Sequence, residues 1–501
     1  MAEKYDENDA TIADDVRTLH RLGYAQELAR RMSGFSNLAL SMSIICILAG
    51  GITSFHLGFC SVGGAAIGIG WPVACLFSLI VAASMAQLAS AFPTAGGLYH
   101  WASILGGRGW GWATAWFNLA GLITVLAAIN VGTFQFLAGC FFPDRAGDVA
   151  LQAVVVSSMT ATQAALNHLG GRVTTRLIDF SGYWILVVAA LLTIALLLAV
   201  EGWEFSRLVT FLNYSGLPRE APVWPATQSM AWLFGLGLLL PAYTISGFDA
   251  SAHASEETIG AAHAVPRGIV RSVLVSGIAG WVMLCALVLA IPDLSGAATR
   301  GPQAFFWILN STLPAWAEKL LYAGIGVAQY LCGLATVTSA SRMTYAFARD
   351  GGLPASGWLR RVSPRFRTPT FAIWSVALAA TLFTIYTPVY STITAVCTIF
   401  LYISYVLPTG LGLLAYRRTW HQMGPWQLGR WYRPLALASV AGCGVLIVLG
   451  MQPPNDRAIW VVGGSLVALQ LLWLLDARRR FPGPPQALEE RLDLRSHRRR
   501  G

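Results

Sequence analysis

Charged residues are scarce in this sequence of 501 residues. Asp, Glu, Lys and Arg together make up 12% of it, whereas hydrophobic residues make up 55%. A soluble domain typically carries about 25% charged residues. Residues 32–107 contain none of these four types, and the stretch is long enough for two membrane crossings of about 20 apolar residues each. The shortage of charge therefore excludes a soluble domain and predicts an all-α polytopic membrane protein.

The sequence also lacks the motifs of several functional classes. It contains no HExxH pair, no paired acids within its apolar runs and no GxxxxGK[ST] loop. We therefore expect neither a membrane-embedded enzyme nor an ATP-driven transporter. The eight cysteines lie in or beside apolar runs, without a CxxC pair or a Cys/His cluster. We expect them to be buried thiols, and we expect no metal site, disulfide framework or cofactor.

The apolar runs predict twelve transmembrane helices. The predicted spans are 36–60, 69–91, 109–143, 149–171, 180–200, 236–258, 272–292, 320–341, two within 370–416 that turn at Thr387-Pro388, 434–455 and 458–475. Residues 92–107 are expected to form an inner loop or a re-entrant helix, and residues 301–317 an outer loop helix. We divide the chain into an N-terminal segment (1–35), a ten-span core (36–416), a loop with two further spans (417–476) and a basic tail (477–501).

The segment before the first span is polar and of mixed charge, so we expect no cleavable signal peptide. Leu19, Leu22, Leu28 and Met32 recur in it at near-helical spacing. This spacing indicates a short amphipathic helix that lies on the membrane surface.

The distribution of Lys and Arg predicts the orientation. An even number of spans places both termini on one side, and all but six of the 34 Lys and Arg residues fall on that side. The exceptions are Arg145, Arg207, Arg219, Arg300, Lys319 and Arg457. By the positive-inside rule both termini are cytoplasmic, in a multi-pass protein of the cell (inner or plasma) membrane. The net charge of +10 thus follows from topology, and we expect the tail to touch anionic lipid of the bilayer rather than nucleic acid.

The sixth span is interrupted. Ser246 and Gly247 break its apolar run, and Phe248 and Asp249 follow directly. A broken helix is tolerated within a membrane only where it lines a cavity or is buried in protein. We therefore predict an unwound hinge at about residues 244–247, with these four residues at a binding site. The alternative is a kinked structural helix whose second half is capped by Asp249.

Asp249 is the one acid that we place well inside a span, and we place no Lys or Arg inside any span. Burial disfavours the ionised form of a carboxyl, so Asp249 is a candidate proton carrier. An ion-coupled transporter needs such a group.

Glu256 and Glu257 stand at the far end of the same span. A helix C-terminus disfavours anions, so we expect a cationic partner such as Arg30, Arg31 or Arg267 to complete an inner gate there. A solvated helix end is the alternative.

The first span is interrupted in the same way. Ala49, Gly50 and Gly51 break it, followed by Ile52. The two broken spans lie five spans apart, so they enter the membrane from opposite sides, which is typical of inverted repeats around a midplane transport site. Small residues let backbone amides approach a substrate carboxylate, and the half-helix N-termini favour its charge. Close helix packing is the alternative explanation for Gly50 and Gly51.

Four motifs carry a resemblance to a known family. They are LAGGI (48–52), FPTAGGLYHW (92–101), SGFD with SEE (246–249 and 255–257) and SASRMTYAFARDGGLP (339–354). With these, residues 15–480 resemble the amino acid–polyamine–organocation superfamily. LGYAQEL near the N-terminus and VPRGI (265–269) point to its γ-aminobutyrate and choline permease branch. Relatives often have Gly-x-Gly-Ile-Phe in the first span, where this chain has Ala49-Gly50-Gly51-Ile52-Thr53.

The resemblance implies a core of five plus five inverted repeats and a small-molecule substrate, an amino acid or an amine. It implies that Tyr243 is an aromatic gate over the substrate. It also implies that Thr338 and Ser339 in span eight stand where sodium-coupled relatives of this fold hold their ion. Bonding of these hydroxyls back to their own helix is the alternative. Asn118 and Asn130 in span three either reach a substrate amine or link helices.

We therefore expect a secondary transporter that moves amino acids, γ-aminobutyrate-like ones among them, by alternating access with proton coupling. Alternatives remain open at this point. They are a choline or polyamine permease, an amino acid exchanger, sodium as the coupling ion, and a substrate sensor that has kept a transporter fold.

Overall fold

The structure, a computed structural model, describes residues 2–200, 202–387 and 390–485. Every named element in these ranges is a helix, and β-structure is confined to two isolated bridges. Ten of the described helices are long and apolar enough to cross a membrane, and two shorter apolar helices, Met230–Thr244 and Thr370–Tyr386, supply two more crossings. The predicted all-α polytopic fold with twelve spans is thereby confirmed.

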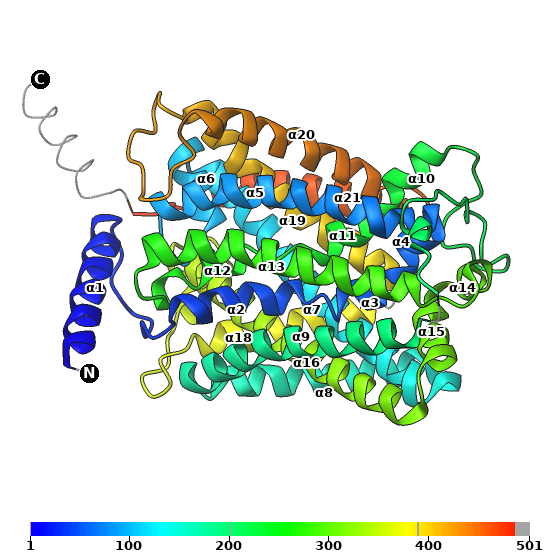
Figure 1. The fold of residues 1–501 in the computed structure, drawn as a ribbon. Coiled ribbons are helices and arrows are strands. Elements are labelled where there is room, and N and C mark those ends of the chain that lie inside the picture. The colour runs from blue at the N-terminus through cyan, green and yellow to red at the C-terminus, as the bar shows by residue number, and fades with distance from the viewer. Residues whose placement is uncertain (1, 201, 388–389, 486–501) are drawn as a thin grey trace, which may run out of the picture.

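The crossing helices run roughly parallel through one bundle, as Figure 1 shows. They are α2 (Gly34–Ile45) with α3 (Gly50–Thr53) and α4 (Phe55–Val62), η1 (Ala66–Gly70) with α5 (Trp71–Ala91), α7 (Arg108–Phe141), α8 (Val149–His168), α9 (Gly171–Ala199), α10 (Met230–Gly237) with α11 (Leu239–Thr244) and α12 (Ala250–His253), α13 (Ala261–Leu289), α16 (Ala315–Arg349), α18 (Thr370–Tyr386), α19 (Tyr390–Ala415), α20 (Tyr432–Gly450) and α21 (Arg457–Leu472).

The two ends of the bundle differ. One end, which we call the terminal end, carries α1 (Ala2–Arg21) and the short helix α6 (Leu98–Gly106). The opposite end, which we call the loop end, carries α14 (Leu294–Arg300) and α15 (Ala304–Thr312). The short helices predicted within 92–107 and 301–317 are thus α6 and α15.

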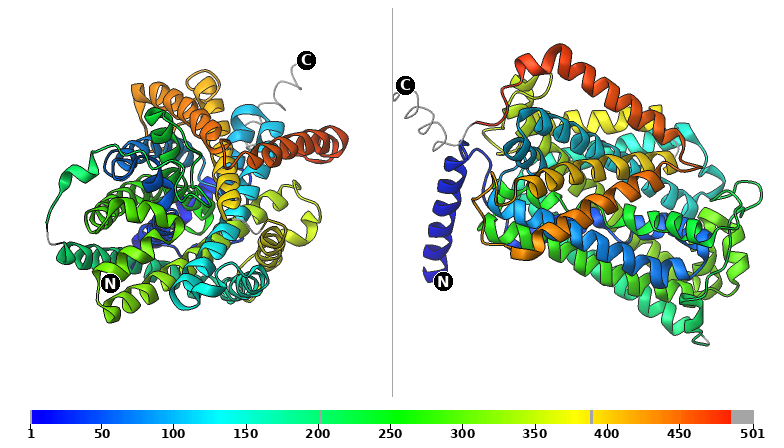
Figure 2. Two further views of the ribbon diagram at one scale, coloured as in Figure 1. Left: turned by 90° about the vertical axis from the view of Figure 1, so that its right-hand side faces the viewer. Right: turned by 90° about the horizontal axis from the view of Figure 1, so that it is seen from above.

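Burial separates central helices from peripheral ones. The most apolar stretch of α7 is 89% buried, whereas that of α21 is 11% buried. A helix that is hydrophobic all round belongs in the interior of a membrane protein, and α7 packs there against α16 and α19. Helix α21 lies at the edge of the bundle in both views of Figure 2. Helix α7, which lines the site described below, is therefore largely shielded from lipid.

Several helix boundaries differ from the prediction. Helix α9 begins at Gly171 rather than at residue 180, so a second acid, Asp179, lies within a span besides Asp249. Helix α16 continues to Arg349 instead of ending at residue 341. The prediction that no Lys or Arg lies inside a span is therefore wrong for Arg342, which is 2% exposed. Charge marks the end of an apolar run, but a helix continues past it where the charge finds a buried partner.

The N-terminal segment also differs. Helix α1 ends at Arg21, and Gly23 follows with a φ of +87°, so no single helix runs through Leu19, Leu28 and Met32. Leu28 and Met32 are nevertheless buried, in a non-helical segment that pairs with the end of span six. The apolar spacing thus correctly indicated that Leu28 and Met32 are apolar contact residues, but the helix that it predicted through them is wrong.

Two predicted features fall partly outside the described residues. The turn between spans nine and ten was placed at Thr387-Pro388, and Pro388 is not described. The basic tail is described only to residue 485, which includes α22 (Arg478–Arg480).

Candidate functional site

Spans one and six are both broken near the middle of the bundle. In span one, α2 ends at Ile45, Cys46 has a φ of +20°, and helix resumes with α3 at Gly50. In span six, α11 ends at Thr244, Gly247 has a φ of +86°, and α12 begins at Ala250. Span one runs from the terminal end to the loop end and span six runs the other way (Figure 1). The two breaks therefore face each other in opposite orientations.

The breaks approach so closely that glycine is required on each. A Cβ on Gly50 would lie 2.8 Å from Oγ1 and 3.0 Å from Cα of Thr244. A Cβ on Gly247 would lie 2.4 Å from Cγ2 of Ile44. Gly247 also has a positive φ, which side chains of L-residues disfavour.

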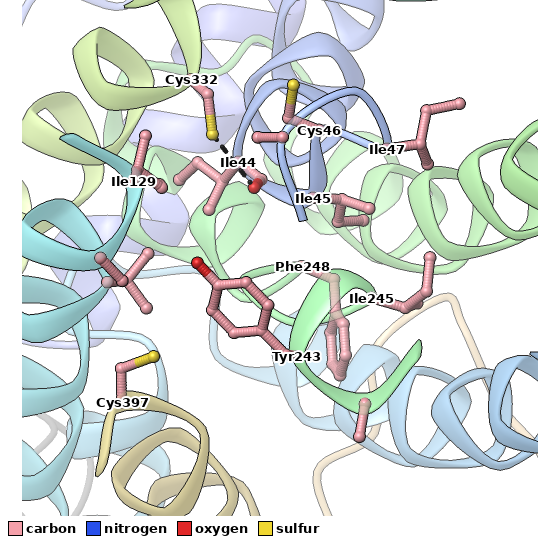
Figure 3. Packing of buried hydrophobic residues seen from close by; sticks show 14 of the residues in the cluster. Ile44, Ile45, Cys46, Ile47, Ile129, Tyr243, Ile245, Phe248, Cys332 and Cys397 are labelled. Atoms are coloured by element: carbon pink, nitrogen blue, oxygen red, sulfur yellow. Dashed lines mark hydrogen bonds between the residues drawn. The ribbon is translucent and has the colours of Figure 1, made fainter. Parts of the chain in front are cut away.

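A small cavity of about 10 Å³ lies between the two breaks. Its lining combines both broken spans with spans three and eight: Ile44, Ile45, Ala49, Gly50, Val125, Ile129, Tyr243, Thr244, Ser246 and Cys332. Figure 3 shows the Tyr243 hydroxyl directed between Ile44 and Ile129. Of the residues predicted to bind substrate, the cavity is therefore lined by Ala49, Gly50, Tyr243 and Ser246.

The other predicted substrate residues lie around the cavity rather than on it. The closest atoms to a Cβ on Gly51 would belong to Trp71, Met283 and Leu284, at 3.7–3.8 Å, so Gly51 faces the spans behind it. Phe248 packs on the ring of Tyr405, with ring centroids 4.9 Å apart. Gly247 lies against Ile44, and Ile52 lines a different cavity, described next.

A larger cavity of about 400 Å³ lies on the side of the loop end, lined by Ile52, Thr53, His56, Gln135, Phe306 and Tyr390 among others. Tyr390 lines this cavity, and its hydroxyl lies 2.7 Å from Oγ1 of Thr53. The rings of Tyr390 and Tyr243 meet edge to face with centroids 6.5 Å apart. These two tyrosines therefore stand between the larger cavity and the small central one.

The backbone amides proposed for a substrate carboxylate are engaged within the turn. The N–H groups of Ala49 and Gly50 both donate to the carbonyl oxygen of Cys46, at 2.8 and 3.1 Å. Binding of an anion at these amides therefore requires the turn at Cys46 to open.

Asp249 is completely buried, and its carboxylate is surrounded by donors. Oδ2 accepts a hydrogen bond of 2.9 Å from Asn118 Nδ2 and lies 3.2 Å from His253 Nε2. Oδ1 accepts one of 2.8 Å from the Tyr405 hydroxyl, which in turn accepts from the N–H of Gly247 at 3.0 Å. The side chain makes no capping bond to α12, so the helix-cap interpretation is wrong.

The two glutamates after span six are paired, but with different cations than predicted. Arg349 binds both oxygens of Glu256 at 2.9 Å, and Arg342 Nε donates to Glu257 at 2.6 Å. Both arginines lie on α16, so these pairs join spans six and eight at the terminal end. Arg30 instead donates to the carbonyl oxygens of the same segment and pairs with Asp15 at 3.5 Å.

Another buried acid, Asp350, follows α16 directly. Oδ2 of Asp350 accepts hydrogen bonds of 2.7 Å from the hydroxyls of both Tyr24 and Tyr99. Burial raises the pKa of Asp350 to about 6, an effect that the neighbouring Arg349 and the two hydroxyls only partly offset. Asp350 thus joins the N-terminal segment, α6 and α16 at the terminal end.

The predicted hydroxyls of span eight are not alike. Thr338 Oγ1 donates to Asn167 Oδ1 at 2.7 Å, which ties α16 to α8. Ser339 Oγ is buried and has no hydrogen-bond partner within the described part of the chain. Asn130 donates to Thr160 and Gln163 on α8, so it links helices.

Sequence reasoning missed several of these residues. The sequence does contain a pattern that could have identified His253, since a spacing of four from Asp249 places both side chains on one helix face. No local sequence pattern identifies Tyr390 or Tyr405, because their hydrogen-bond partners lie on spans one and six, far away in sequence. Among the described residues, no group of three His, Cys, Asp or Glu side chains is arranged to hold a metal ion.

Comparisons with known proteins agree with this architecture. The profile of a family described as amino acid permease matches residues 32–474. The amino-acid permease BAT1 of Arabidopsis thaliana is 32% identical over 93% of this chain and 95% of its own length. A putative polyamine transporter of Candida albicans is 26% identical over 96% of the chain and 91% of its own length. The GABA-specific permease of Saccharomyces cerevisiae is 29% identical over 74% of the chain and 66% of its own length.

Proposed function

We propose a function for this chain on one premise: it belongs to the amino acid permease family. It is thus a multi-pass membrane transporter of amino acids or amines rather than an enzyme. Within that class we propose that it moves an amino acid by alternating access, driven by protons. The observation that carries the proposal is the central cavity between the two broken spans, lined by Ala49, Gly50, Tyr243 and Ser246.

The site supports an amino acid over a simple amine. An amine needs an accessible anion, and the nearest candidate, Asp249, is already surrounded by Asn118, Tyr405 and His253. It does not line the central cavity. A substrate carboxylate, by contrast, has N–H groups at the edge of the cavity, those of Ala49 and Gly50, which become available once the turn at Cys46 opens. Tyr243 and Tyr390 would then cover the substrate from the side of the larger cavity.

The size of the central cavity supports alternating access. Small-molecule sites usually measure about 300–1,000 Å³, so a cavity of about 10 Å³ is contracted and must expand to take substrate. The larger cavity approaches it from the loop end. The ion pairs of Glu256 and Glu257 close the terminal end. The arrangement therefore suits a transporter that is closed at its terminal end.

We propose that the terminal end is cytoplasmic, in the cell (inner or plasma) membrane, because nearly all Lys and Arg lie on that side. Residues 36–416 would then form the transport core, preceded by the segment 1–35. Residues 417–476 would add two spans at its edge, and the tail 477–501 would meet anionic lipid.

We propose a proton as the coupling ion and Asp249 as the group that loads it. If sodium is the ion instead, the hydroxyl of Ser339, which has no hydrogen-bond partner among the described residues, is the first place to look, together with Thr338 beside it. An exchanger would move amino acids in both directions without net ion flux, and a sensor would bind them without moving them.

Uptake into liposomes tests the proposal. Purified protein is reconstituted with internal unlabelled amino acid, and counterflow of a labelled amino acid is measured against a panel of competitors. We expect amino acids with a free carboxylate to compete, and their esters and amides to compete at least tenfold less well. Stronger competition by choline or putrescine than by any amino acid would make the amine permease correct. Binding without counterflow would favour the sensor.

A further inference from the structure

His253 is fully buried and lies between the break of span six and the loop that follows span two. Its Nδ1 atom is 3.2 Å from the carbonyl oxygen of Ala95, and its Nε2 atom is 3.2 Å from Oδ2 of Asp249. A carbonyl oxygen only accepts hydrogen bonds, so Nδ1 must carry a hydrogen. In a neutral ring, Nε2 then carries none and presents a lone pair to the carboxyl of Asp249.

The contact between His253 and Asp249 therefore requires one further proton. With it, either an imidazolium donates to the carboxylate or a carboxylic acid donates to Nε2; the proton belongs to the pair. Without it, a lone pair faces a negative oxygen at 3.2 Å in a buried site, which is repulsive. A separation of 3.2 Å between these two atoms therefore favours the proton-bound form.

The remaining neighbours of the pair cannot supply this proton. Asn118 donates an amide hydrogen to Oδ2, and the hydroxyl hydrogen of Tyr405 is directed at Oδ1. Of the elements packed on α12, α2 contributes Asn37 and Ser41, which bond to Ser251, and α13 contributes Gly268. Element η4 (Ser255–Glu257) contributes the two glutamates, each of which is paired with an arginine of α16.

One residue, Ala95, links the pair to the closure of the terminal end. The carbonyl oxygen of Ala95 faces His253, while the N–H of Ala95 donates to Oε1 of Glu256 at 3.1 Å. Glu256 is held in turn by Arg349. The imidazole also lies beside Gly97 of this loop, where an added Cβ would be at ordinary contact distance, 3.4 Å, from its Cε1 and Nδ1 atoms. Because Ala95 contacts both side chains, a shift of the imidazole ring changes the residue that donates to Glu256.

We propose that His253 and Asp249 form a proton-binding site whose single shared proton keeps the terminal end closed. The inference rests on the proposed transport function and names the residue pair that couples it to protons. The proton enters from the loop end. A transient opening of the terminal end exposes the pair and lets it release the proton on that side, which leaves a neutral imidazole beside a carboxylate. Their repulsion displaces the ring from Ala95, which loosens the contact with Glu256 and favours opening. One proton crosses for each cycle of opening.

The test uses His253→Gln in liposomes, because glutamine can still hydrogen-bond Ala95 but cannot bind a transferable proton. His263→Gln is the matched control, since His263 is an exposed histidine on α13 near the same end. Two quantities are measured: counterflow at equal pH on both sides, and accumulation driven by a pH difference of one unit. A wild-type protein that moves one proton per substrate accumulates up to about tenfold under that gradient.

We expect His253→Gln to retain counterflow within about tenfold of wild type but to accumulate nothing beyond equilibrium, and His263→Gln to behave as wild type. If size-exclusion chromatography shows that His253→Gln folds poorly, Asp249→Asn replaces it. We expect the same loss of accumulation driven by the pH difference. A folded variant of either kind that keeps the wild-type response to the pH gradient overturns the inference. So does wild-type accumulation that ignores pH and follows sodium. Absence of counterflow in the wild type would instead contradict the proposed function itself.

Discussion

Arg349 and Glu256 form a bidentate ion pair that joins span eight to the end of span six. The two guanidinium N–H groups each lie 2.9 Å from a carboxylate oxygen, and the Glu256 side chain is fully buried. The guanidinium also lies 3.9 Å from the ring centroid of Tyr24, in the N-terminal segment. This one pair therefore connects three separate parts of the chain at the terminal end.

Replacement of one member of this pair should destabilise the protein more than replacement of both. Arg349→Met leaves the carboxylate of Glu256 buried without a cation, at a cost of about 3–5 kcal/mol, whereas in the double variant with Glu256→Gln neither side chain is charged. We expect a large fall in melting temperature in detergent for the single variant and substantial recovery in the double. Arg145→Gln, at an exposed arginine of the loop end, is the control. Equal melting temperatures for the single and double variants would show that the pair is not coupled.

Gly50 and Gly51 should tolerate substitution very differently. A Cβ at position 50 would lie 2.8–3.1 Å from three atoms of Thr244, whereas at position 51 the nearest atom is 3.7 Å away. Gly50→Ala must therefore push the two breaks apart, and we expect amino acid uptake to fall at least tenfold. Gly51→Ala should transport at close to the wild-type rate. Uptake per amount of folded protein measures both, and a greater loss at position 51 would contradict the structure.

The sequence was sufficient to predict both broken spans and their opposite directions, because a helix break shows locally in small residues such as Ser246 and Gly247. It was not sufficient to choose between the adjacent glycines of span one. Gly50 faces Thr244 and Gly51 faces Trp71 because of how α3 is rotated, and that rotation is set by packing with other spans. The residues near Gly50 and Gly51 in the sequence therefore do not predict the rotation of α3.

Ionic partners were hardest to predict for the same reason. Charged residues close in sequence or near the predicted membrane surface were the natural partners for the glutamates, which suggested Arg30, Arg31 and Arg267. The observed partners, Arg342 and Arg349, lie on a helix that continues beyond its apolar run. Burial of an arginine inside a span becomes favourable only when it forms an ion pair with a carboxylate there. Whether such a pair forms depends on the tertiary fold.

Asp350 should make the stability of the protein depend on pH. Its pKa of about 6 lies above the ordinary value of 3.8 because the carboxyl is buried, so the folded state binds this proton more tightly than the unfolded chain. The resulting stabilisation is complete below about pH 4 and is lost as the pH rises through about 6. Asp350→Asn cannot titrate but can still accept from Tyr24 and Tyr99.

Melting temperatures of wild type and Asp350→Asn, measured from pH 4.5 to 7.5, test this dependence. We expect the wild type to lose stability relative to the variant as the pH rises, with little further change above about pH 7. Other titrating groups affect both proteins equally and cancel in the difference. A difference that stays constant across this range would mean that Asp350 titrates alike in the folded and unfolded states.

Tyr390 should act as the barrier between the larger cavity and the substrate site. It lines the cavity of about 400 Å³, and its hydroxyl contacts Thr53 at 2.7 Å and Ser54 at 3.3 Å. Its ring stands at right angles to that of Tyr243, which lines the central cavity. Removal of the ring would therefore join the two cavities.

Two substitutions distinguish the role of the Tyr390 hydroxyl from the role of its ring. Tyr390→Phe loses the bonds to span one but keeps the ring, so we expect weaker closure, seen as a several-fold higher KM with accumulation intact. Tyr390→Ala removes the barrier itself. Bound substrate would then escape back toward the loop end before the terminal end opens, so accumulation should fall several-fold while counterflow persists. Tyr386→Phe, on a side chain that is 86% exposed, controls for the loss of a tyrosine nearby. Normal accumulation by folded Tyr390→Ala would place the barrier elsewhere, with Tyr243 as the remaining aromatic residue able to form it.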